Sequence, residues 1–174
     1  MIDQPDPETG TTIEEEIRQQ RPFHSAHAAA AVSIMRTAAL IDRFYSHVLA
    51  QADLTPQQYN VLRILRGAGT EGMPTLEIRN RMIHEAPGIT RLIDRLEESG
   101  LVRRERTRSD RRQVLCYISN RGLDLLENLD SEMKAADLAA VGGLTEAELR
   151  DLLHLLSRIR AAHRSCERKV VLEH

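Results

Sequence analysis

Residues 87–112 read PGITRLIDRLEESGLVRRERTRSDRR, and this stretch decides the fold expected for the chain. Apolar side chains recur in it at intervals of three and four from Ile89, which predicts a helix over residues 87–99 with one apolar face. Pro87 suits the first helical position, where its missing N–H is no loss. Gly100 suits the left-handed residue that ends many helices.

The second half of this stretch predicts a small β-hairpin. Residues 101–106 and 113–118 have the composition of two strands, and residues 107–110 form a polar tip. Six Arg lie between positions 103 and 112. Arg suits both phosphates and guanine edges because its guanidinium presents a fork of donors. A short helix with a polar outer face, followed by such a hairpin, therefore predicts a unit that binds DNA.

Another short helix is expected directly before this one. Residues 76–83 predict it, and Thr75 is its expected cap. Its buried side is expected to carry Leu76, Ile78 and Met82. Residues 84–86 then form a tight turn into the helix at 87–99. Two short helices joined in this way, the second with a polar outer face, are typical of the helix-turn-helix motif.

Two earlier helix starts precede the motif. Thr12 and Glu15 match the capping-box pattern. Residues 23–52 contain no Gly or Pro and predict a long helix. The tetrapeptide TPQQ at 55–58 combines a capping box with a Pro at the first helical position, so it marks the start of the next helix. The apolar side of that next helix is expected to carry Tyr59, Leu62, Ile64 and Leu65.

Two more helices are expected after the hairpin. Ser119 is placed to cap the first, which runs to about residue 140 and ends at a Gly-Gly pair. The pattern LTEAE at 144–148 is another capping box and opens a last helix to about residue 170. This last helix is apolar over more than one face. We therefore expect the N- and C-terminal helices to meet a second copy of the chain.

Composition bounds the class of protein. With 174 residues, of which 41% are hydrophobic, the chain suits one domain, or one domain with long extensions, and a real core. It contains no run of about 18 apolar residues that would span a membrane. The N-terminus lacks the basic start and apolar run of a signal peptide. Cys116 and Cys166 match no metal spacing. A cytoplasmic protein with no membrane contact is therefore expected.

The net charge of −2 hides an uneven distribution. Residues 61–121 carry 13 Arg and 8 acidic residues, so positive charge gathers around the opening stretch while the remainder of the chain is acidic. Such a local basic region is frequent in nucleic-acid binders. On charge alone, a solvated charged surface is the alternative explanation.

Four motifs resemble the MarR/SlyA family of bacterial winged-helix regulators: LTPQQYNVL, ITRLIDRLEESGLVRR, SDRRQV and ISNRG. The resemblance implies a mainly α fold with a small β-hairpin wing, in which a winged helix-turn-helix lobe is joined to N- and C-terminal dimerisation helices. The expected organisation is a flexible tail (1–11), N-terminal dimerisation helices (12–53), the DNA-binding lobe (54–121), C-terminal dimerisation helices (122–171) and a remnant that looks like a purification tag (172–174).

The resemblance also implies roles for individual residues. The helix at 87–99 matches the family's recognition helix, which lies in the major groove, and Arg91 is expected to contact guanine. The Asp-x-Arg motif of the wing matches Asp110 and Arg112, so Arg112 is expected in the minor groove and Asp110 is expected to hold it. Ala86 stands where a capping Ser is common in the family, which leaves Glu85 to cap the helix or interact with its dipole. The expected DNA-binding residues are Pro87, Gly88, Thr90, Arg91, Arg95, Arg106, Arg108, Asp110, Arg111 and Arg112.

A small-molecule effector is a further implication of the resemblance. The usual pocket of the family lies between the long first helix, the second helix and the start of the fifth. The polar candidates near it are His24, His27, Arg43 and Tyr59. Capping a helix or covering the dimer interface is the alternative role for each of them.

Neither a metal site nor a thiol switch is expected. The seven histidines form no cluster with acidic or Cys partners at ligand spacing. Cys116 lies in a wing strand with apolar neighbours on the same face, so we expect it in the core. Cys166 lies near the C-terminus, and nothing in the sequence around it indicates a redox role.

No motif indicates an enzyme, since the chain has no Gly-rich phosphate loop, nucleophile elbow or recognisable pair of carboxylates. No cofactor is expected. The expected function is a sequence-specific regulator that binds double-stranded DNA, in the form of a homodimeric repressor on a pseudo-palindromic operator that a small-molecule effector releases. The alternative is a winged-helix protein-interaction module, or an activator with weak DNA binding.

Overall fold

The computed structural model describes residues 11–106 and 114–172, and the side chains of this part as far as His163. Two compact units divide the chain. Residues 11–136 form the larger one, and the smaller one contains the described residues from Asp137 onward. The predicted tail and the tag-like end lie almost wholly outside the described residues.

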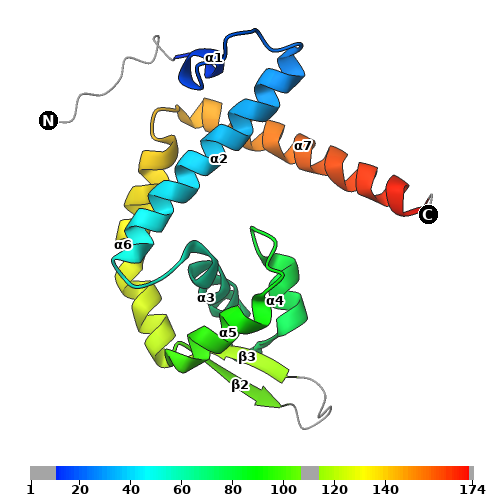
Figure 1. The fold of residues 1–174 in the computed structure, drawn as a ribbon. Coiled ribbons are helices and arrows are strands. Elements are labelled where there is room, and N and C mark those ends of the chain that lie inside the picture. Colours follow the sequence, from blue (N-terminus) through cyan, green and yellow to red (C-terminus); the bar gives the residue numbers. More distant parts are fainter. Residues whose placement is uncertain (1–10, 107–113, 173–174) are drawn as a thin grey trace, which may run out of the picture. The chain divides into compact units, whose positions relative to one another are not determined.

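Local capping starts the N-terminal helices α1 (Ile13–Glu16) and α2 (Ala26–Ala50) (Figure 1). The Thr12 hydroxyl accepts a hydrogen bond from the Glu15 amide at 3.3 Å, and the Glu15 carboxylate accepts one from the Thr12 amide at 3.0 Å. The predicted capping box is therefore confirmed. α2 starts three residues later than predicted because the Ser25 hydroxyl caps it and accepts a hydrogen bond from the Ala28 amide.

The next helix, α3 (Pro56–Ala68), begins at the predicted capping box of Thr55 and Gln58. It continues into one turn of 3-10 helix, η1 (Gly69–Glu71). The buried residues of α3 are Tyr59, Val61, Leu62 and Leu65. The prediction is thus confirmed for three of the four apolar positions, whereas Ile64 is only partly buried against the core.

The helix-turn-helix consists of α4 (Thr75–Arg81) and α5 (Ile89–Glu98). Thr75 is the first residue of α4 and not its cap, and its hydroxyl lies 3.7 Å from the Cys116 sulfur. Ile78 is fully buried as predicted, but Leu76 is 59% exposed. The predicted burial of Leu76 is wrong because residues two apart on a helix face nearly opposite sides, and Ile78 occupies the inner side.

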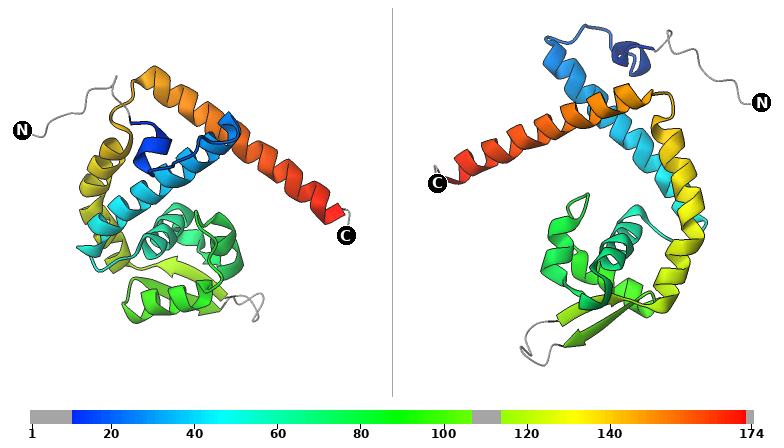
Figure 2. Two further views of the ribbon diagram at one scale, coloured as in Figure 1. Left: turned by 45° about the horizontal axis from the view of Figure 1, so that its top comes forward. Right: turned by 180° about the vertical axis from the view of Figure 1, so that it is seen from behind.

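A three-stranded antiparallel sheet completes this lobe, in the order β1-β3-β2. β2 (Val102–Arg106) and β3 (Val114–Ile118) form the predicted hairpin. β1 (Met73–Pro74) is not among the predicted strands, and it pairs with Leu115 and Cys116 of β3. Two residues carry no local strand pattern, so only this long-range pairing makes β1 a strand. Figure 2 shows the lobe in two further views.

An apolar core holds α5 against the rest of the lobe. No polar or charged side chain is buried among the described residues. Burying one Leu or Ile side chain contributes roughly 1.5–3 kcal/mol. The side chains with an exposure of 0–1% come from six elements and are Leu49, Val61, Leu62, Leu65, Ile78, Ile93, Leu96, Cys116 and Leu126.

After the hairpin, α6 (Asn120–Val141) starts as predicted, because the Ser119 hydroxyl accepts a hydrogen bond from the Gly122 amide at 3.0 Å. The same hydroxyl donates to the Gly100 carbonyl at 2.7 Å. The start of α6 is therefore tied to the turn that follows α5. Leu126, Leu129 and Met133 of α6 belong to the core of the larger unit.

The smaller unit contains the end of α6 and the helix α7 (Glu146–Leu172). The predicted capping box is present, because the Glu148 carboxylate accepts a hydrogen bond from the Thr145 amide at 2.7 Å and the Thr145 hydroxyl accepts one from the Glu148 amide at 3.3 Å. Hydrogen bonds from Thr145 hold the pKa of Glu148 below its ordinary range. None of the described helices is long and apolar enough to cross a membrane.

Candidate nucleic-acid interface

α5 has one buried face and one exposed face. Ile93 and Leu96 are fully buried and Ile89 is 7% exposed, so the helix is anchored along its inner side. The opposite side is exposed and carries Thr90, Arg91, Arg95 and Glu98, with Pro87 and Gly88 exposed just before the helix. The five residues expected to contact DNA at this helix are thus all exposed. α5 begins two residues later than predicted, so Pro87 lies before Gly88, the cap, and not at the first helical position.

The turn before α5 is held from another helix. The Asn60 side chain of α3 accepts a hydrogen bond from the Ile83 amide at 2.9 Å. Ala86 is buried, and its carbonyl accepts a hydrogen bond from the Ile89 amide at 3.1 Å. No side chain caps α5, so Glu85 does not cap it, and an interaction of Glu85 with the helix dipole stays a prediction. The exposed N-terminus of α5 therefore keeps backbone N–H groups available for an anion.

The turn after α5 reverses the chain into the wing. Gly100 has a φ of +70°, which confirms the predicted left-handed residue. Its amide donates to the Glu97 carbonyl at 2.8 Å, and the Leu101 amide donates to the Leu96 carbonyl at 2.9 Å. This exit places β2 directly after the helix, so the wing and α5 are joined by a short, hydrogen-bonded turn.

Two wing arginines are engaged within the protein. Arg103 lies over the Tyr117 ring, 4.2 Å from the ring centroid to Cζ, and pairs with Glu105. Arg104 pairs with Asp94 and Glu97 of α5. The hydrogen bond from Arg104 holds the pKa of Glu97 below its ordinary range, and the same contact raises the pKa of Arg104. Arg104 and Asn60 were not among the predicted site residues, because both act through partners on other elements, which the fold brings beside them.

The rest of the predicted wing site is mostly beyond the described residues. Arg106 ends β2 and is exposed. The expected DNA-binding residues that lie outside the described residues are Arg108, Asp110, Arg111 and Arg112.

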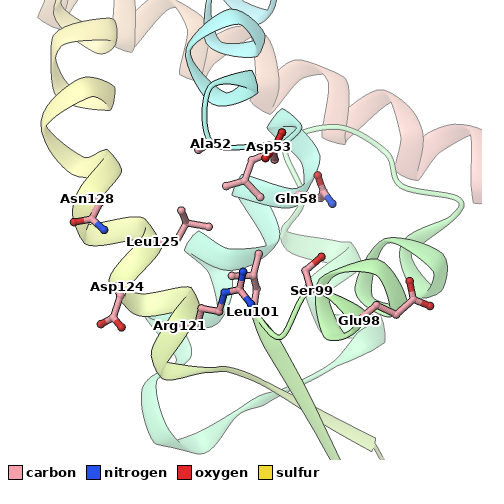
Figure 3. Close-up of a pocket in the computed structure, with 11 residues that line it drawn as sticks. Ala52, Asp53, Gln58, Glu98, Ser99, Leu101, Arg121, Asp124, Leu125 and Asn128 are labelled. Carbon is pink, nitrogen blue, oxygen red and sulfur yellow. The ribbon is translucent and has the colours of Figure 1, made fainter.

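A cavity of about 530 Å³ lies beside the C-terminal end of α5. Gln58 lines it from the first turn of α3, Ser99 lines it from the end of α5, and Arg121 and Leu125 line it from α6 (Figure 3). Leu54, just before α3, also lines it. The cavity therefore lies near the elements expected to form an effector pocket. The four candidate effector residues do not line it. They are His24, His27 and Arg43, which are exposed, and Tyr59, which is buried and accepts a hydrogen bond from Arg63 at 3.0 Å.

The described residues contain no group of three or more His, Cys, Asp or Glu side chains placed to hold a metal ion. Cys116 is fully buried as predicted, and burial raises the pKa of its thiol. A buried thiol with a raised pKa is a poor nucleophile. The side chain of Cys166 lies outside the described residues.

Comparison with known proteins identifies the family. The model of the MarR family matches residues 52–113. A crystal structure of a MarR transcription factor from Planctomyces limnophilus is 38% identical, with 78% of this chain and 98% of that chain covered and a TM-score of 0.61. The chain belongs to the MarR family. Its helix-turn-helix and wing are those of a MarR-type transcriptional regulator.

Two further transcriptional regulators are similar to the chain. The regulator TtmR of Methylorubrum extorquens is 36% identical over 118 residues, which cover 68% of this chain and 58% of TtmR. The match thus spans less than two thirds of that relative. A mutant MarR from E. coli, solved in complex with operator DNA, is 25% identical with a TM-score of 0.66, and the match covers 72% of this chain and 89% of that one.

Proposed function

We propose that the chain is a sequence-specific DNA-binding regulator that acts in the cytoplasm on a pseudo-palindromic operator. The observation that carries this proposal is the exposed face of α5, where Thr90, Arg91 and Arg95 stand opposite a fully buried face. A helix anchored in this way offers its outer side chains to the major groove without any rearrangement of the core. The related E. coli MarR was solved in complex with operator DNA, which supports DNA binding by this fold.

The proposed contacts divide into base and backbone contacts. Arg91 contacts guanine, and Thr90 and Arg95 contact bases or phosphates beside it. Pro87 and Gly88 let the exposed N-terminus of α5 approach a phosphate. The wing contributes phosphate and minor-groove contacts through Arg106, Arg108, Arg111 and Arg112, with Asp110 holding Arg112.

A homodimer is the proposed working form. Among the side chains of α7 that the structure describes, those of Leu153, Leu155 and Ile159 are large, apolar and exposed. α2 likewise exposes Ile34, Met35, Leu40 and Phe44. Apolar side chains gathered on terminal helices are characteristic of a surface that a partner covers. Two copies would then place two α5 helices in major grooves about one helical turn apart.

Repression with release by an effector is the proposed mode of action. MdtR of Bacillus subtilis, 28% identical over 116 residues, is named a transcriptional repressor. An effector in the cavity beside Ser99 would contact the C-terminal end of α5. It would thereby change the distance between the two α5 helices of the homodimer. Asn128→Trp, which narrows this cavity from α6, is expected to abolish release by a small molecule without changing operator affinity.

Selection of bound sites from random DNA tests the proposal. The expected result is a palindromic consensus whose two halves lie about one helical turn apart. Recovery of sequences without a consensus would overturn sequence-specific regulation. Binding to enriched sites is then compared in buffers of increasing salt, since phosphate contacts make affinity fall with salt concentration.

A protein-interaction module is the second candidate function. Two apolar side chains, Leu76 (59% exposed) and Ile83 (79% exposed), lie exposed on the same lobe as α5 and favour it. A partner protein that covers these residues would make DNA binding secondary. Failure to enrich a palindrome, together with loss of partner binding in Ile83→Ser, would support this candidate over the first.

A further inference from the structure

Arg104 occupies a special place between the wing and α5. It lies in the middle of β2, opposite Cys116 of β3. Its side chain is 30% exposed, compared with 51% for its neighbour Arg103. Successive residues of a strand face opposite sides of the sheet, so Arg104 faces the helix while Arg103 faces the Tyr117 ring.

The Arg104 side chain is satisfied by two carboxylates of α5. Its Nε donates to Glu97 Oε2 at 2.7 Å, its Nη1 lies 2.7 Å from Asp94 Oδ1, and its Nη2 also contacts Glu97 Oε2. The backbone amide of Arg104 donates to the other Glu97 oxygen at 3.1 Å. One residue of the wing thus holds α5 at two points, which are three residues apart on the same side of the helix.

These contacts restrain a motion that the core alone leaves open. Apolar packing is non-directional, and it opposes separation of a helix more than a small rotation about its axis. Charge-assisted hydrogen bonds from a planar guanidinium are directional. Because they engage Asp94 and Glu97 together, a rotation of α5 breaks at least one of them.

We infer that Arg104 is a positioning residue for DNA recognition, which fixes the rotation of α5 relative to the wing and so sets the direction of Arg91 and Arg95. This inference rests on the proposed function. Two carboxylates surround the charge of Arg104, so its role lies in discrimination between DNA sequences and not in general attraction to phosphates. The Arg103–Glu105 pair lies within β2, and Arg103 lies over the Tyr117 ring of β3, so this pair provides a matched comparison within the wing.

The test compares two charge-neutral double variants with the wild-type chain. Arg104→Met with Glu97→Gln removes the contact to α5, and Arg103→Met with Glu105→Gln removes the neighbouring pair. Neither changes the net charge. Backbone hydrogen exchange is measured without DNA for α5 and for α3, and affinity is measured for the selected operator and for a random duplex of equal length.

The Arg104/Glu97 variant is expected to exchange about tenfold faster in α5 but not in α3, and to lose about tenfold in the ratio of operator affinity to random-duplex affinity. The Arg103/Glu105 variant is expected to match the wild type in hydrogen exchange and in the affinity ratio. Arg104→Lys keeps the charge but not the fork of donors, so its affinity ratio should fall between those of the wild type and the Arg104/Glu97 variant. Arg104→Lys also serves as the second variant if the double variant does not fold.

The positioning role requires both faster hydrogen exchange in α5 and a lower ratio of operator affinity to random-duplex affinity in the Arg104/Glu97 variant. Unchanged exchange in α5, or an unchanged affinity ratio, would overturn the positioning role of Arg104. An equal loss of affinity for both duplexes would likewise overturn it, because it would make Arg104 an ordinary contributor to phosphate attraction. A wild-type chain that binds both duplexes equally would overturn the proposed function itself, and this outcome is seen before any variant is compared.

Discussion

Arg91 lies on the exposed face of α5, one turn before Arg95. The apolar residues on the opposite face hold the helix in place. Arg91→Ala should therefore leave the fold intact and remove a base contact. We expect a loss of about 1–3 kcal/mol at the selected operator and relaxed specificity at one base pair. Binding titrations against the operator and its single-base variants measure both effects.

Arg150→Ala is the control for this change. It removes the same charge from an exposed position of α7 and should leave operator affinity unchanged. If Arg91→Ala weakened binding to operator and random DNA equally, Arg91 would be a phosphate contact and its assignment to guanine would be wrong.

Gly72 has a structural role that is visible only in three dimensions. Its φ of +65° lies in a region that other residues rarely adopt, and a Cβ here would lie 2.4 Å from the Tyr117 ring. Gly72→Ala should lower the free energy of unfolding by at least about 1–3 kcal/mol, as measured by urea denaturation. Gly67→Ala, at an open helical position of α3, should instead be neutral or stabilising by up to about 1 kcal/mol. Equal midpoints for the two variants would contradict the steric argument.

At the scale of elements, the turn between α4 and α5 depends on one side chain of α3. Asn60→Ala removes the acceptor of the Ile83 amide and should cost about 0.5–1.5 kcal/mol of stability. It should also reduce operator affinity, since this turn sets where α5 begins. Asn128→Ala makes the same change on α6 and should affect neither the stability nor the operator affinity. Wild-type operator affinity in Asn60→Ala would show that the turn holds its position without Asn60.

The contact between β2 and α5 should make stability depend on acidity. Arg104 holds the pKa of Glu97 below its ordinary range. In the unfolded chain, Glu97 takes up a proton near the ordinary glutamate pKa of about 4.3. In the folded chain, Glu97 takes up its proton only at a lower pH. The contribution of the Glu97–Arg104 contact to the free energy of unfolding is therefore complete above the ordinary glutamate pKa. It is lost as the pH falls through the pKa of Glu97 in the folded chain.

Urea unfolding from neutral pH to well below the ordinary glutamate value measures this dependence. Glu97→Gln should flatten the loss of stability in the acid range, while Glu98→Gln, at the exposed neighbouring position, should keep the wild-type profile. Identical profiles for the wild type and Glu97→Gln would show that the contact with Arg104 contributes no stability.

At the scale of the whole molecule, the exposed apolar side chains of the terminal helices predict self-association. Leu153→Glu places a charge at a position that is 64% exposed in the single chain. It should therefore leave the protomer folded but shift the molecular mass in sedimentation from dimer to monomer. Operator affinity should fall as well, because the second half-site then no longer binds at high effective concentration.

Arg158→Glu introduces the same carboxylate at an exposed polar position of α7 and should preserve the dimer. A wild-type chain that sediments as a monomer would exclude the proposed homodimer. A Leu153→Glu chain that remains dimeric would place the interface elsewhere on the protein.

The local sequence determined most of the helices and the family of the protein. Thr12, Thr55 and Thr145 begin helices as predicted, because a capping box forms within four consecutive residues. Gly100 ends α5 for an equally local reason, its positive φ. The exposed face of α5 followed from the spacing of its apolar residues. The exposed arginines of the proposed site could therefore be named before the structure was known.

Tertiary structure alone decided how these elements are held together. β1 exists because Met73 and Pro74 pair with a strand some forty residues away, and Leu76 is exposed because Ile78 takes the inner side of a short helix. Arg104 of β2 pairs with α5 because the fold brings Asp94 and Glu97 beside it. Packing decides which side of a short helix turns inward and which residues of different elements meet, and the local spacing of residue types leaves both open.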